Sequence, residues 1–99
     1  MIKAELHVPK AISFDSSKLT SEEVAKFKKI NTEISNWFLA NKVELPITPD
    51  LDMSIEINSF LKNAKGLSSE TTEEIDMESI YFEITEIIIC NGYLDIRFD

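Results

Sequence analysis

The dipeptide Asn91-Gly92 stands between two runs of strand-forming residues near the C-terminus and constrains the fold more than any other feature of the sequence. Asn-Gly is typical of a two-residue type I′ hairpin, because both central positions of that turn need a positive φ. Such a turn fixes the register of its two strands. The expected pairs are Ile89 with Leu94, Ile87 with Ile96, Glu86 with Arg97 as opposite charges, Thr85 with Phe98, and Ile84 with Asp99.

The first strand of this hairpin changes face partway along. Its apolar residues are Ile80, Phe82 and Ile84 on one face, then Ile87 and Ile89 on the other. A β-bulge near Thr85-Glu86, or burial of both faces, reconciles the two halves. Residues 79–83 extend beyond the second strand and need another neighbour, for which the N-terminal strand is the candidate.

Two further elements are predicted from the first half of the chain. Residues 2–8 alternate apolar and polar side chains, the period of a strand with one solvated face, and Pro9 ends them. The sequence from Thr20 to Glu23 has the form of a capping box and starts a helix that runs to about Asn41. Its apolar stripe consists of Val24, Phe27, Ile30, Ile34, Trp37 and Phe38.

A second helix is expected after Thr48-Pro49, with the threonine as N-cap and the proline in the first turn. Gly66 is expected to end it, and residues 67–77 are interpreted as a loop with room for one helical turn. The stripe of this helix is Met53, Ile57, Phe60, Leu61 and Ala64. The predicted fold is therefore α+β, with a small three-stranded, mainly antiparallel sheet, two helices on one face, and the order β-α-α-β-β ending in the hairpin.

Length and charge limit the classes of function. The chain has 99 residues, which fit a single domain, 1–99, with one modest core. Residues 1–49 carry a net charge of +1, whereas residues 50–99 carry −9. Because affinity for nucleic acid comes largely from cations, this charge disfavours direct binding to nucleic acid and favours a basic protein partner. The N-terminus has no signal-peptide pattern and no apolar run is long enough for a membrane helix, so we expect a cytoplasmic protein without membrane contact.

Catalytic and metal motifs are weak in this sequence. Cys90 and His7, each the only residue of its type, are interpreted as a small hydrophobe and an exposed strand residue, not as a nucleophile and its base. Asp50-x-Asp52-x-Ser54 resembles the start of an EF-hand loop, but the required glycine and glutamate are missing, and acids in a first helical turn explain the spacing. We therefore predict no enzyme activity, no cofactor and no metal site.

The acidic segment 70–86 is the predicted functional surface, because it holds seven acids and no base. It is also consistent with a merely solvated surface. The partner-binding residues expected there are Glu70, Glu73, Glu74, Asp76, Glu78 and Glu83.

Three hypotheses follow for the function. The first is a small acidic inhibitor, most concretely an immunity protein that neutralises a basic bacterial toxin, often a nuclease, by occluding its cationic cleft. The second is a phage anti-defence inhibitor of the anti-CRISPR type that acts by charge mimicry. The third, from another class, is an assembly module that forms a homodimer through the open edge of the final strand.

Overall fold

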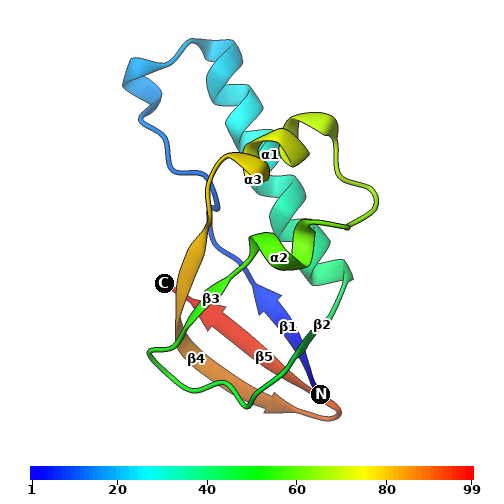
Figure 1. Cartoon of the computed structure of the whole chain (residues 1–99). Helices are drawn as coiled ribbons and strands as arrows, with labels where there is room; N and C mark the ends of the chain where they lie inside the picture. Colours follow the sequence, from blue (N-terminus) through cyan, green and yellow to red (C-terminus); the bar gives the residue numbers. More distant parts are fainter.

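Five strands form one mixed sheet in the order β2-β1-β5-β4-β3, which curves into a half-barrel (Figure 1). The computed structural model describes residues 1–99. The strands are β1 (Ile2–His7), β2 (Val43–Leu45), β3 (Ser54–Glu56), β4 (Tyr81–Cys90) and β5 (Tyr93–Phe98). The helices are α1 (Ser21–Ala40), α2 (Asn58–Leu61) and α3 (Ser69–Met77), with a 3₁₀ turn at Ser16–Lys18. No helix is both long and apolar enough to cross a membrane.

The predicted three-stranded sheet with two helices is wrong. The N-terminal strand β1 pairs in parallel with β5, not with the start of β4, so β5 lies in the middle of the sheet. The neighbour that residues 81–83 required is β3, which pairs with them antiparallel. β2 then adds to the other side of β1. Both extra strands have three residues, and strands this short give little sequence signal.

The long second helix is also wrong, because the segment predicted for it divides into a turn, a strand and a short helix. Asp52 has a φ of +70°, which a helix does not allow, and a turn at Asp50–Met53 leads into β3. Met53, Ile55 and Ile57 alternate with polar residues, which is the period of a strand. Met53 and Ile57 also belong to the apolar stripe of the predicted helix, so this segment fits both a helical and a strand period. It forms a strand because it pairs with β4.

Helix α1 confirms the prediction from the capping box. The Thr20 hydroxyl accepts a hydrogen bond from the Glu23 amide at 3.2 Å, and the Glu23 carboxylate accepts one from the Thr20 amide at 3.1 Å. The buried side chains of the helix are Ile30, Ile34 and Phe38. Within the segment interpreted as a loop, α3 forms instead, capped by Ser68 and buried through Thr71 and Ile75.

The C-terminal hairpin has the predicted pairs from Glu86 to Cys90 and a bulge at Thr85. Because of the bulge, Ile84 pairs with Phe98. The predicted pairs of Thr85 with Phe98 and of Ile84 with Asp99 are therefore wrong. Only Gly92 has a positive φ in the turn, +87°, so the turn is not type I′. A negative φ followed by a positive one is the pattern of a type II turn.

The bulge puts Phe82 and Ile84 of the first half of β4 and Ile87 of the second half on the inner face of the sheet. Ile84 and Ile96 are completely buried there, together with Ala4 and Leu6 of β1. The three helices gather on one side of the strands in Figure 1, and α1 packs against β1. The outer face carries the alternating polar residues and is not covered by any helix, so Ile88 is 40% exposed.

Candidate functional site

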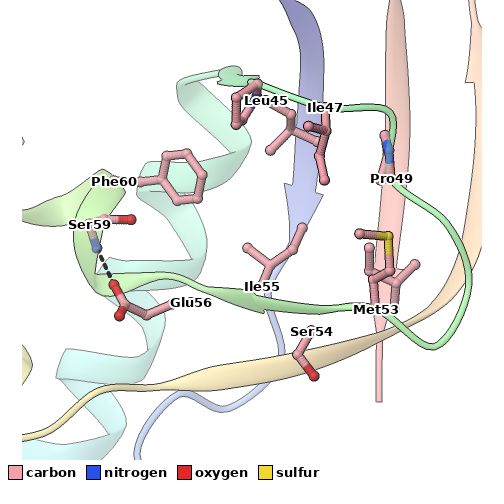
Figure 2. A pocket seen from close by; sticks show the side chains of 11 residues that line it. Leu45, Ile47, Pro49, Met53, Ser54, Ile55, Glu56, Ser59 and Phe60 are labelled. Carbon is pink, nitrogen blue, oxygen red and sulfur yellow. Dashed lines mark hydrogen bonds between the residues drawn. The ribbon is translucent and has the colours of Figure 1, made fainter.

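An apolar cleft opens between the segment 46–53, β3 and α2 (Figure 2). The segment 46–53 joins the two edge strands of the sheet, and its Asp52 amide donates to the Ile84 carbonyl at 3.0 Å. The cleft has a volume of about 390 Å³. Its apolar lining is Leu45, Pro46, Ile47, Pro49, Met53, Ile55, Phe60 and Ile84, with Ser54, Glu56 and Ser59 at its polar end.

An acidic hollow of about 470 Å³ adjoins the cleft and shares Glu56 and Ser59 with it. Its charged lining residues are Glu56, Asp76, Glu78 and one base, Lys62. The remaining lining residues are Asn58, Ser59, Ile75, Met77 and Ser79. Three carboxylates and one ammonium group give this hollow a negative potential, next to a cleft that is mainly apolar.

The side chain of Asn58 holds the walls of the acidic hollow together. Its amide nitrogen donates to the carbonyls of Ile75 and Glu78 at 2.6 and 2.7 Å, and its oxygen accepts from the Ile80 amide at 2.6 Å. These bonds connect the start of α2 to the end of α3 and to the entry of β4. Glu56 is held on the other wall, where its carboxylate accepts from the Ser59 amide at 3.1 Å (Figure 2).

Large apolar side chains are exposed beside these carboxylates. Met77 lines the acidic hollow and is 76% exposed. Tyr81 is 61% exposed and lies opposite Glu56 in the β3–β4 pairing. Exposed apolar groups rimmed by polar ones are typical of protein-binding surfaces. We call the cleft, the hollow, Met77 and Tyr81 together the anionic surface.

Four of the six acids predicted for partner binding lie at this surface. Asp76 and Glu78 line the hollow. Glu73 is exposed on α3, one turn before Met77. Glu83 is exposed on β4 opposite Ser54, which lines the cleft.

The other two acids have structural surroundings. Glu70 occupies the first turn of α3, where the helix dipole favours a carboxylate. Glu74 is half-buried and lies 4.0 Å from Lys26 of α1. Glu70 and Glu74 line neither the cleft nor the hollow, and Glu74 lies toward α1.

Glu56 and the apolar cleft were not predicted from the sequence. Glu56 lies in the segment that was predicted as a helix, so nothing placed it beside the acidic segment. The signal available was the alternation around Ile55, which predicts a strand and therefore a neighbour in β4. Asp50 and Asp52, which were interpreted as acids in a first helical turn, lie instead in a turn that leads into β3.

The outer face of the sheet carries a second polar cluster, on β1 and β5. His7 lies between the carboxylates of Glu5 and Asp95, and these three residues are the group whose atoms could hold a metal ion. Cys90 is opposite Tyr93, four residues along β5 from the partner of His7, so the two do not form a dyad. A hydrogen bond with Cys90 and the charge of Cys90, then the charges of Glu5 and Asp95, raise the pKa of Tyr93.

No family model, no curated protein and no solved structure matches the chain.

Proposed function

We propose that this protein is a small, non-enzymatic inhibitor that binds a basic protein through the anionic surface. The observation that carries the proposal is that an apolar cleft and an acidic hollow share Glu56 and Ser59. A partner segment with an apolar side chain next to a lysine or arginine fits both at once. Apolar burial would then set the lifetime of the complex, and charge would speed its formation.

An immunity protein against a bacterial toxin, most often a nuclease, is the most concrete form of this function. The active cleft of a nuclease is cationic because it binds a phosphate backbone. A chain with a net charge of −8 complements such a cleft and blocks it without any chemistry of its own. An anti-defence inhibitor that mimics nucleic-acid charge on an effector uses the same surface, and the activity of the captured partner distinguishes the two.

The test is capture of the partner from the native host, followed by affinity measurements with matched variants. Glu73→Gln, Asp76→Asn and Glu78→Gln combined should weaken binding by at least about tenfold, since each removes a charge facing the partner. A control with the same change in net charge combines Glu22→Gln, Glu44→Gln and Asp99→Asn, all exposed and outside the surface. Equal affinity of the two triple variants would overturn the proposal.

The cleft is tested separately from the charge. Ile47 lines the cleft and is 59% exposed, so Ile47→Ala should leave the fold intact and weaken the complex by losing an apolar contact. Leu51, which is 52% exposed and outside the lining, provides the control Leu51→Ala.

Inhibition of a captured toxin indicates immunity, and a toxin gene immediately upstream supports it. Inhibition of a nucleic-acid-guided effector in a prophage context indicates anti-defence.

A homodimeric assembly module is the second candidate, favoured by one open strand edge. The final strand β5 cannot supply that edge, because β1 and β4 flank it. The open edge belongs to residues 86–90 of β4, since β3 pairs only with residues 81–83. Ile88 and Ile89 are 40% and 85% exposed there. A dimer that persists at high salt and is lost in Ile89→Lys supports this function, whereas a monomer at all salt concentrations excludes it.

A further inference from the structure

We propose that Glu5, His7 and Asp95 form a binding site for Zn²⁺ on the outer face of the sheet. This site is independent of the anionic surface, which lies on the segment 46–53, β3, α2, α3 and the start of β4. The parallel pairing of β1 and β5 creates it: Glu5 is opposite Asp95, and His7 follows two residues later on the same face. Side chains from the two ends of the chain therefore converge on one point.

The distances between the three groups suit a chelated ion. Nε2 of His7 lies 3.0 Å from Oε1 of Glu5 and 3.1 Å from Oδ2 of Asp95. All three ligand atoms lie within 4.8 Å of one another. Zinc lies about 2.0–2.2 Å from nitrogen and oxygen ligands, so two ligands of one ion are at most about 4.4 Å apart, and both distances from His7 to the carboxylates are well within that limit.

The Nε2 atom of His7 is buried and has no hydrogen-bond partner. Both carboxylate oxygens are close enough to accept a hydrogen bond from it, so they must flank the nitrogen and not lie in line with its N–H. A divalent metal ion on the nitrogen axis can contact Nε2 and the two flanking oxygens at the same time.

Neighbouring cations orient the two carboxylates. Lys42 Nζ lies 3.8 Å from Oε2 of Glu5, which leaves Oε1 directed at His7. Arg97 donates from Nε to Oδ1 of Asp95 at 3.2 Å and more weakly from Nη2 to Oδ2 at 3.5 Å. Partners of this kind around metal ligands fix the ligand geometry. They also reduce the local negative charge, so we expect a dissociation constant on the order of micromolar, weaker than that of a structural zinc site.

One imidazole and two carboxylates favour Zn²⁺ over Mg²⁺ and Ca²⁺, which prefer sites made of oxygen alone. The three side chains are 26%, 20% and 14% exposed for His7, Glu5 and Asp95, so an ion can enter from solvent. Three protein ligands leave the fourth tetrahedral position open for water or for a ligand atom of another molecule.

The test is a titration of the untagged, full-length protein with Zn²⁺, followed by calorimetry and by ¹⁵N NMR of the imidazole. Because the chain has one histidine, its ring signals are unambiguous. We expect one Zn²⁺ per chain and a shift of the Nε2 signal, with no effect of Mg²⁺. His7→Ala should abolish binding, and Glu5→Gln and Asp95→Asn should each weaken it at least about tenfold.

Glu44→Gln is the matched control, since Glu44 is an exposed carboxylate on the outer face of β2, opposite Lys3. It should bind Zn²⁺ like the unchanged protein. The two carboxylate variants keep the test valid if His7→Ala does not fold. An unchanged imidazole spectrum at millimolar Zn²⁺, or equal binding by the unchanged protein and by Glu5→Gln and Asp95→Asn, would overturn the proposal.

Discussion

Asn58 uses its whole carboxamide to join three backbone segments. Its partners, Ile75, Glu78 and Ile80, lie 17 to 22 residues later in the chain. Two of them are carbonyls at the end of α3, where a helix leaves its last carbonyl groups without intrahelical partners. The side chain therefore pairs with two of the carbonyls at this helix end, next to Asp76 and Glu78 at the acidic hollow.

Asn58→Ala should lower the free energy of unfolding by about 2–4 kcal/mol, because it leaves three backbone groups without this partner, and two of the three hydrogen bonds are partly buried. Urea unfolding followed by circular dichroism measures the change. Asn63→Ala is the control, at an exposed position where the side chain makes no hydrogen bond within the protein, and should stay within about 0.5 kcal/mol of the unchanged protein. Similar effects of the two substitutions would contradict this role of Asn58.

Thr20 and Asn58 show which hydrogen-bonding roles of side chains can be predicted from the sequence. Thr20 bonds to an amide three residues away, so its role follows from local spacing. Asn58 acts on residues that only the tertiary fold brings near. The same holds for Asn31, which exchanges two hydrogen bonds with the backbone of Ile12, 19 residues earlier. Glu56 and the His7 cluster were missed for this reason.

At the scale of elements, prediction succeeded where one signal was strong and local. The capping box predicted α1, and Asn-Gly between two strand-like segments predicted the hairpin. The change of face along β4 predicted either a bulge near Thr85 or burial of both faces, and the structure has the bulge. It failed between residues 43 and 77, where the elements are short. A three-residue strand such as β3 has no stability of its own and exists because β4 pairs with it.

The two central residues of the hairpin turn, Asn91 and Gly92, should differ in how much their substitution lowers the free energy of unfolding. Gly92 has a φ of +87°, and a Cβ built there meets no atom within 4 Å, so substitution is costly only through the backbone. Gly92→Ala should lower the free energy of unfolding by about 1–2 kcal/mol. Gly92→Asn should cost less, because asparagine adopts positive φ more readily.

Asn91→Ala is the comparison, because Asn91 does not have a positive φ in this turn. Its free energy of unfolding, measured by thermal or urea denaturation, should change by less than about 0.5 kcal/mol. A type I′ turn would instead make both positions sensitive. Equal losses at Asn91 and Gly92 would therefore contradict the turn type described here.

At the scale of the whole molecule, the N-terminal strand is an interior element and not an added edge. β1 lies between β2 and β5, and its Ala4 and Leu6 side chains are completely buried. The sequence predicts that β1 is a strand but does not predict its neighbours, because parallel pairing with β5 joins the two ends of the chain. Its position in the sheet is a property of the tertiary fold alone.

Native-state hydrogen exchange tests this position directly. The amides of Leu6 and Ile96 should exchange only through global unfolding, with protection within about 1 kcal/mol of the free energy of unfolding, because both residues are completely buried, Leu6 pairs with Ile96, and β4 flanks Ile96 on the other side. The amides of β3 should exchange earlier through local opening, since β3 is a three-residue edge strand. If the ends of the chain frayed as terminal segments usually do, the Leu6 amide would exchange as fast as the amides of the edge strand β3. That result would contradict a closed β1–β5 pair, and it would also remove the basis for a site that joins Glu5 and His7 to Asp95.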